Sequence, residues 1–383
     1  MEELVGQGAD TVLLGPRNLQ SLAEKLGTRF TPYEAESTLD YDWSRPEGRD
    51  KHGLGPENGD DWFHRRVLAE FAEVDRAART FRPDVIVTDS FVVGAGLAAE
   101  KLGVPWVSYV HYLFDESADT DAMYRVWWER PGTPDLDAYC AWWDGIRAAV
   151  GLDAEPRRRE EAPWFRMSPQ STFLLGHPHL RRGHRPLPDF VSRTSLRPWD
   201  ERGHTEASTA IAATASPRPR VLLANSSAWQ EDFDLVLATL DGLRDLDVEV
   251  LATVSAAHPL PDTPPSNATV MGYHSHTEVM PSVDAVVTTS GYGIASKALW
   301  FGKPLVTVPH ARDQHYVADA VEKAGCGISL TWPPEPDAVR SAVQGVLSSD
   351  SLSGQVSRLS GPMPGFASAG DVAADIISRA GRS

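Results

Sequence analysis

The chain has 383 residues, of which 42% are hydrophobic, and this length fits two domains better than one. Its net charge of −17 argues against a surface for nucleic acid or anionic membranes. Two distant cysteines and the lack of a long apolar run predict a cytoplasmic protein without disulfides, metal ligands or a membrane span.

The first part of the chain alternates short apolar runs with helical patterns. Strands are expected at Thr11–Leu14 and Phe30–Tyr33, with a helix over Leu19–Leu26 between them. Residues 39–60 are rich in Asp, Gly and Pro, which predicts a loop. A helix should then cover Trp62–Phe81.

The clearest early unit is a strand–helix–strand crossover. A buried strand at Val85–Thr88 is followed by a helix over Gly94–Leu102 and a strand at Pro105–Tyr109. Such a crossover implies a parallel sheet. Asp89 therefore stands at the carboxyl end of the first of these strands, and His111 comes just past the second.

Aromatic residues concentrate between residues 115 and 165. Two tryptophan pairs, Trp127-Trp128 and Trp142-Trp143, lie near Tyr124 and Tyr139. We interpret most of these rings as helix packing, with one or two facing an apolar ligand pocket.

A second α/β series follows a polar segment at residues 197–219. The expected strands are Arg220–Ala224, Val248–Val254, Leu305–Val308 and Gly327–Leu330, and the expected helices are Leu235–Leu243, Gln314–Ala324 and Ala369–Ala380. We therefore divide the chain into a domain over 1–197, a linker over 198–219, a domain over 220–368 and a terminal helix over 369–383.

The segment Asp284–Phe301 carries the first chemical signal. A strand runs into Gly291-Tyr292-Gly293 and then into a helix. The glycines let a ligand approach the backbone, and the helix N-terminus offers free N–H donors with partial positive charge, so a pyrophosphate fits there. The alternative is an ordinary strand–helix turn whose glycines serve geometry alone.

A second signal, Pro309-His310-Ala311-Arg312-Asp313-Gln314, follows the next strand at the end where open α/β sheets bind ligands. Asp313 accepts two hydroxyl hydrogens, while Gln314 donates one hydrogen bond and accepts another. Facing the pyrophosphate loop, the two would clasp a sugar. The alternative is that Asp313 caps the following helix.

Together these segments resemble the donor-binding signature of family-one glycosyltransferases of the GT-B fold, especially the bacterial natural-product (antibiotic or macrolide) type. That signature reads His-Gly-Gly-x-Gly-Thr, x-x-Glu-Ala-Leu, Gly-x-Pro and Pro-x-x-x-Asp-Gln. Without a gap, this chain keeps Gly291, Gly293, Ala298-Leu299, Gly302, Pro304, Pro309 and Asp313-Gln314. It departs at Thr289, Ser290, Ile294 and Lys297, where the family has His, Gly, Thr and Glu.

The resemblance implies a site for a UDP- or dTDP-sugar. The donor-binding residues it implies are Asn225, Ser226, Ser227, Tyr273, Thr289, Ser290, Gly291, Gly293, Ile294, Asp313 and Gln314. Tyr273 would stack on the base, although a packed interface ring is its alternative. A hydroxyl at Thr289 or Ser290 still donates to phosphate, whereas Lys297 can pair with phosphate but cannot accept from ribose.

The resemblance further implies two Rossmann-like, doubly wound parallel sheets facing a cleft. Its activity would be inverting transfer to a hydrophobic natural product, with a nucleotide sugar as co-substrate and no metal or other cofactor. In the family, an Asp at the position of Asp89 orients a histidine general base near the N-terminus. His111 is the other candidate base here; the alternatives are an Asp89 bonded to its own loop and a structural His111.

The start of the chain also bears on this resemblance. Residues 3–14 resemble the family's Leu-x-x-x-Gly-His-x-Val segment, with Ala9 in place of the His. In the family that segment follows a first, central strand and the loop with the catalytic histidine. We therefore expect roughly 20 residues to be missing before Met1. A chain beginning there should be poorly stable and lack family-type base catalysis.

Two other functions fit parts of the pattern. The altered signature is compatible with a noncatalytic or auxiliary homologue that binds sugar nucleotides weakly. More remotely, Gly291-x-Gly293-x-x-Ser296 approaches the dinucleotide fingerprint of a nicotinamide-dependent oxidoreductase, although its third position is Ser.

Overall fold

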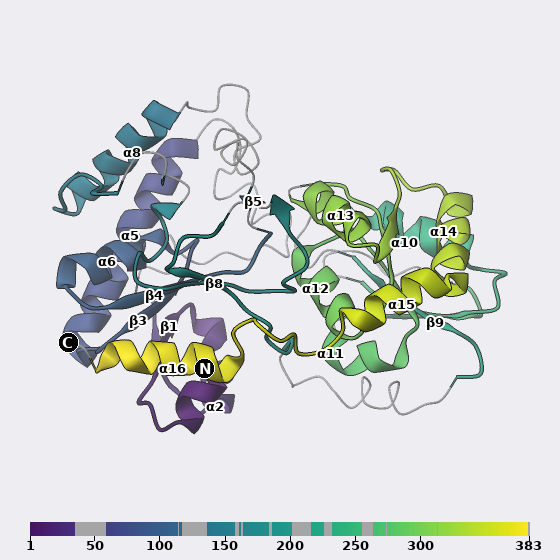
Figure 1. Cartoon of the computed structure of the whole chain (residues 1–383), viewed down its shortest axis with the longest axis horizontal. Coiled ribbons are helices and arrows are strands. Elements are labelled where there is room, and N and C mark those ends of the chain that lie inside the picture. Colours follow the sequence, from purple (N-terminus) through teal and green to yellow (C-terminus); the bar gives the residue numbers. More distant parts are fainter. Residues whose placement is uncertain are drawn as a thin grey trace.

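A computed structural model gives the architecture of the chain. It describes residues 1–34, 59–113, 115–116, 136–157, 161, 164–183, 186–200, 216–225, 232–254, 263–272, 274–311 and 313–381. Most of the expected loop at 39–60, most of the linker and the pair Trp127-Trp128 lie outside these residues. Figure 1 shows an N-terminal and a C-terminal domain lying side by side.

The N-terminal domain is built from short strands and longer helices. Its elements are α1 (Glu2–Gly6), β1 (Val12–Gly15), η1 (Arg17–Leu19), α2 (Gln20–Lys25), β2 (Arg29–Pro32), α5 (Gly59–Phe81), β3 (Ile86–Asp89), α6 (Val93–Leu102), β4 (Trp106–Val110), β5 (Asp115–Glu116), α8 (Leu136–Ala149), β6 (Thr172–Leu174), β7 (Arg182–Gly183) and β8 (Val191–Arg193).

The C-terminal domain alternates strands and helices more regularly. Its elements are β9 (Arg220–Ala224), α10 (Phe233–Gly242), β10 (Glu249–Thr253), β11 (Ala268–Met271), α11 (His276–Val279), η3 (Met280–Ser282), β12 (Ala285–Thr288), α12 (Tyr292–Trp300), β13 (Leu305–Thr307), α13 (Gln314–Lys323), β14 (Gly327–Ser329), α14 (Pro336–Ser348) and α15 (Asp350–Arg358), after which α16 (Ala369–Ala380) ends the chain.

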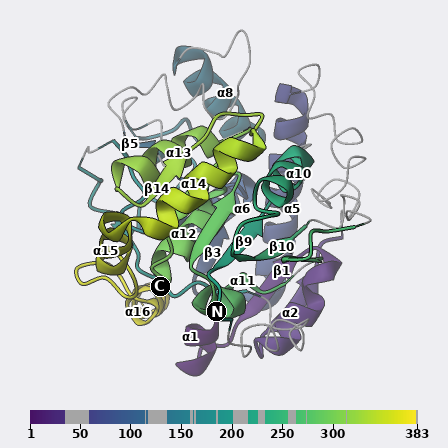
Figure 2. The same cartoon turned by 90° about the vertical axis from the view of Figure 1, so that its right-hand side faces the viewer.

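The C-terminal sheet is wholly parallel in the order β11-β10-β9-β12-β13-β14. This is the doubly wound order in which ligands bind where the strand order reverses, here between β9 and β12. Along β9, Val221 and Leu223 pack toward α10 and α14, whereas Leu222 and Ala224 pack toward α12 and α15. Figure 2 shows this domain from its own end of the molecule.

The N-terminal domain has a four-stranded parallel sheet in the order β3-β4-β6-β8. Val74 of α5 and Ala98 of α6 belong to one buried cluster. On the other side, Ile376 of α16 packs with Val107 and Phe173, so the last helix of the chain belongs to the first domain (Figure 1). The sequence predicts the bounds of α16 correctly but not this packing.

Strands β1 and β2 form a separate two-stranded parallel sheet. In the described part of the chain, no strand joins β1 to β3, and Val87 of β3 is 41% exposed. The expectation that a strand is missing from this domain stays a prediction.

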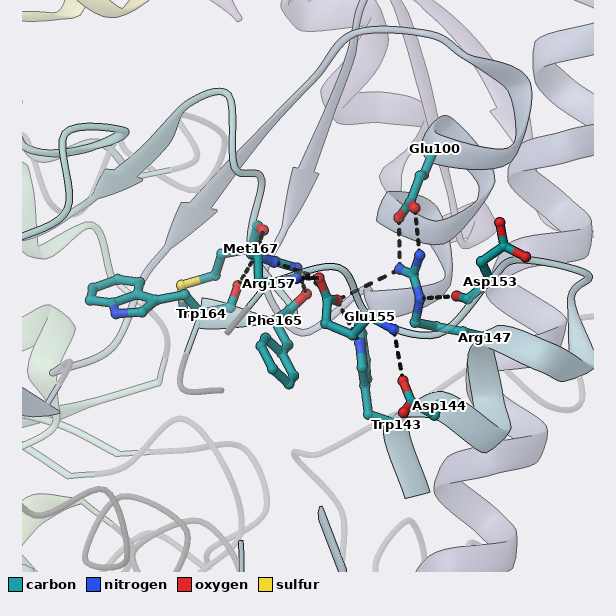
Figure 3. A network of polar contacts seen from close by, with 10 residues as sticks. All are labelled: Glu100, Trp143, Asp144, Arg147, Asp153, Glu155, Arg157, Trp164, Phe165 and Met167. Carbon is teal, nitrogen blue, oxygen red and sulfur yellow. Dashed lines mark hydrogen bonds and ion pairs between the residues drawn. The ribbon is translucent and has the colours of Figure 1, made fainter. Parts of the chain in front are cut away.

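A buried polar network holds the segment after α8 in place (Figure 3). The guanidinium of Arg147 donates to both carboxylate oxygens of Glu100, at 2.8 and 2.6 Å. Glu155 accepts from the indole of Trp143 at 2.8 Å and pairs with Arg157 at 2.8 Å. Trp143 is 1% exposed, so the packing interpretation is correct for this ring.

Among the described residues, no helix is long and apolar enough to cross a membrane.

Candidate active site

An Asp–His pair lies at the carboxyl edge of the N-terminal sheet. Asp89 is opposite Tyr109 in the β3–β4 register, so His111 follows at the same edge. The Asp89 Oδ2 atom lies 2.6 Å from His111 Nδ1. Asp89 Oδ1 accepts a 2.7 Å bond from the backbone N–H of Phe91. The expected bond of Asp89 to its own loop is therefore present, and its other oxygen binds His111, while its catalytic role stays a prediction.

The surroundings of His111 make it basic. Burial by itself lowers the pKa of this imidazole, but the hydrogen bond and charge of Asp89, together with the charge of Asp313, raise it above its ordinary value. Since Nδ1 donates to Asp89, Nε2 is the atom left to exchange a proton. The side chain is 52% exposed, which a ligand-facing residue requires.

Asp313 of the C-terminal domain acts electrostatically on His111 of this pair. It immediately precedes α13 at the carboxyl end of β13, and its charge acts on His111, Tyr112 and Tyr292. Asp313 occupies the N-cap position of α13, as the alternative interpretation expects, but its side chain makes no capping bond there.

The glycine loop lies between β12 and α12. Gly291 precedes the helix with φ −59°, and Gly293 also lies outside the positive-φ region. A β-carbon added at Gly291 would meet nothing closer than 3.8 Å, and one added at Gly293 would meet no atom within 4 Å. Neither backbone conformation nor packing therefore requires glycine at these positions, which favours ligand approach over geometry alone.

Thr289 and Ser290 precede these glycines and are fully buried. Ser290 has φ +69°, a conformation that side chains other than glycine adopt only at a cost. Within the described residues, its hydroxyl oxygen has no hydrogen-bond partner. Ser290 precedes α12 by two residues, and backbone N–H groups in the first turn of a helix lack helical acceptors.

The end of β9 adjoins this loop. Ala224 is opposite Thr288 in the β9–β12 register, so Asn225 and Thr289 leave the sheet side by side at the switch point. Ser226, Ser227 and Tyr273 lie outside the described residues.

Gln314 makes hydrogen bonds that the sequence does not predict. It is 2% exposed, and its Oε1 accepts from the backbone N–H groups of His310 and Ala311, both at 2.9 Å. The acceptor oxygen of Gln314 thus holds the loop that carries Asp313.

Lys297 also differs from expectation. Its ammonium group bonds to Asp200, which additionally accepts from the Thr277 N–H at 2.8 Å and hydroxyl at 2.7 Å. The lysine therefore neutralises a carboxylate at the start of the linker. Asp200 is 97 residues away in sequence, so no local pattern reveals this pairing.

Replacing Ser290 with Gly should separate strain from ligand binding. Glycine accepts φ +69° freely, so the free energy of unfolding should stay the same or rise by up to about 1 kcal/mol. If the hydroxyl donates to a phosphate, the affinity for UDP or dTDP should nevertheless fall by about tenfold. Calorimetric titration and urea unfolding measure the two effects. Unchanged affinity in Ser290→Gly would remove the hydroxyl from the donor site.

Replacing Gln314 with Ala should loosen its loop. Two half-buried backbone N–H groups lose their acceptor, which lowers the free energy of unfolding by about 1–3 kcal/mol. Gln314→Glu is the matched variant, because its carboxylate oxygens can still accept both bonds. Urea unfolding compares the three proteins, and an alanine variant as stable as the wild type would contradict this role.

Comparisons with known proteins agree with this architecture. Residues 237–378 match the family described as "Erythromycin biosynthesis protein CIII-like, C-terminal domain". The 4'-demethylrebeccamycin synthase of Lentzea aerocolonigenes is 28% identical over 86% of this chain and 82% of its own length.

Solved structures extend the likeness to the whole fold. The spinosyn forosaminyltransferase SpnP superposes with a TM-score of 0.76 at 19% identity, over 99% of this chain and 94% of its own. The glycosyltransferase VinC in complex with dTDP gives 0.70 at 20% identity, over 100% and 94%. These relatives leave the nicotinamide alternative without support. The chain has the GT-B fold, and these matches together support a family-one glycosyltransferase of the antibiotic-biosynthesis type.

Proposed function

We propose that this protein is an inverting glycosyltransferase that moves a sugar from a UDP- or dTDP-sugar to a hydroxyl group of a hydrophobic natural product. The observation that supports this most strongly is the Asp89–His111 pair, in which the imidazole is half exposed and feels the charge of Asp313 on the other domain. It places a base on the N-terminal domain and hydroxyl-binding chemistry on the C-terminal domain.

In this proposal the acceptor hydroxyl gives its proton to His111 Nε2 as its oxygen attacks the anomeric carbon. The bond between that carbon and the diphosphate oxygen breaks on the opposite face, which inverts the configuration. Asp89 stabilises the imidazolium that forms. The N–H groups at the start of α12 stabilise the leaving diphosphate, so the step needs no metal or other cofactor.

The donor would lie across the switch point of the C-terminal sheet. Thr289, Ser290 and the glycine loop would hold the diphosphate, and Asp313 would accept bonds from sugar hydroxyls. Asn225, Ser226 and Ser227 would flank the diphosphate, and Tyr273 would stack on the base. The dTDP bound to VinC supports a nucleotide of this class.

The surroundings of His111 support a flat, apolar acceptor. The Phe91 ring lies 5.5 Å from the imidazole and 4.9 Å from the Tyr112 ring, between centroids. Aromatic walls with a few polar groups are typical of pockets for hydrophobic small molecules.

The wild-type protein tests this proposal directly. UDP-glucose or dTDP-glucose is supplied with umbelliferone as a flat phenolic acceptor, and released diphosphate and glycoside are measured with and without EDTA. A β-glycoside formed from the α-linked donor, undiminished by EDTA, is expected. Binding of UDP or dTDP without turnover, across a wider set of phenolic and indole acceptors, would instead support the noncatalytic alternative.

A further inference from the structure

Tyr292 lies between the two glycines of the donor loop, yet its side chain reaches into the other domain. Its hydroxyl donates to the carbonyl oxygen of Leu175 at 2.9 Å. Its ring covers Gly176, which has φ +101°, and a β-carbon there would come within 2.5 Å of the ring. Leu175 and Gly176 of the N-terminal domain therefore form the contact site for this ring.

The segment that contacts the Tyr292 ring is hydrogen-bonded directly to β4, the strand that His111 follows. Leu175 immediately follows β6, and its N–H donates to the carbonyl oxygen of Val110 at 2.8 Å. Val110 is the last residue of β4, and His111 comes next in the chain. Val110, the residue before His111, is thus connected through Leu175 and two hydrogen bonds to Tyr292, the first residue of α12.

Further contacts hold the same segment against the C-terminal domain. The His177 N–H donates to Ser296 Oγ at 3.1 Å, and its Nε2 donates to the Leu359 carbonyl at 2.8 Å. Burial lowers the pKa of His177 to about 4, so the ring is neutral at pH 7 and its Nε2 carries the proton. Ser296 is four residues after Tyr292, so both act from one face of α12.

Resting on the proposed function, we propose that Tyr292 is a positioning residue that holds the donor loop in register with the Asp89–His111 pair. Domains within a chain move relative to each other unless specific contacts prevent it. Transfer requires the acceptor oxygen and the anomeric carbon to be about 3–3.5 Å apart, and a misplacement of about 1 Å costs roughly 100-fold in rate. Tyr292 is joined by peptide bonds to Gly291 and Gly293, so fixing the position of Tyr292 also restrains both glycines.

Tyr292→Phe tests this role with little change in packing, because the ring stays over Gly176. We expect the kcat for glucosylation of umbelliferone to fall by about 10–100-fold. The Kd for UDP and dTDP and the KM for the sugar nucleotide should change by less than about threefold. Tyr316→Phe is the matched control, since this α13 ring keeps its contact with Arg182. It should keep the wild-type kcat.

Hydrogen exchange provides a readout that needs no turnover. In Tyr292→Phe the amides of Leu175 and His177 should exchange faster, while those of Thr172–Leu174 should stay protected. An unchanged kcat in Tyr292→Phe, or an equal loss of diphosphate affinity and kcat, would overturn the positioning role. Failure of the proposed function would look different, because the wild type itself would then release no diphosphate.

Discussion

In His111→Gln, the kcat for sugar transfer should fall by about 10²–10⁴-fold, the usual contribution of a general base. Glutamine can still bond to Asp89 but cannot take a proton from the acceptor. The affinity for UDP or dTDP should not change, since these ligands would bind to the other domain. His64→Gln on α5 is the control. A His111 variant that keeps most of its activity would show that another residue is the base.

The same pair sets the expected dependence on pH. Because the pKa of His111 lies above its ordinary value, activity should rise as the pH increases through that raised pKa. Asp89→Asn removes the charge that contributes to the shift, so the rise should occur at lower pH and reach a lower plateau. If the midpoint of the pH–rate profile does not move in Asp89→Asn, Asp89 does not influence the pKa of the base.

The effect of this pair on stability has a definite sign. A raised pKa means that the folded state binds the His111 proton more tightly than the unfolded state. The stabilisation is therefore complete below the unfolded pKa near 6.5 and disappears as the pH rises through the folded pKa. It should be small, because the side chain is half exposed.

The regular parts of the C-terminal domain follow from local patterns. The strand at Arg220–Ala224 is predicted with its observed bounds, because an unbroken apolar run suits a strand covered on both faces. The three-residue strands β6 and β8 carry no such pattern, since pairing with neighbouring strands defines them. Helices α14 and α15 have no counterpart among the elements that the sequence predicts.

The candidate site, too, has a part that the sequence predicts and a part that it does not. The turn at 289–294 is visible in the sequence, because a strand, two glycines and a helix follow one another. The contacts that give individual residues their surroundings are not visible, since they join distant parts of the chain. Tyr292 and Leu175 are 117 residues apart, and the roles of Gln314 and Lys297 depend on tertiary structure as well.

Gly293→Val should abolish donor binding and leave the fold intact. A β-carbon at this position would meet no protein atom within 4 Å, so we expect the protein to accommodate valine here. Valine is also the better helix former, so the free energy of unfolding should not fall. A bound diphosphate would approach the start of α12 at this point, and the added methyl groups would exclude it.

The size of the loss follows from the bonds removed. A hydrogen bond to a charged group contributes about 1.5–3 kcal/mol, so losing even two of them lowers the affinity for UDP or dTDP by at least about 100-fold. Calorimetric titration measures this loss, with Gly354→Val in α15 as the control for a helical glycine. If Gly293→Val binds the diphosphate as the wild type does, the phosphate lies elsewhere. The glycine would then have no explanation in conformation, packing or ligand approach, and the donor site would have to be sought away from the switch point.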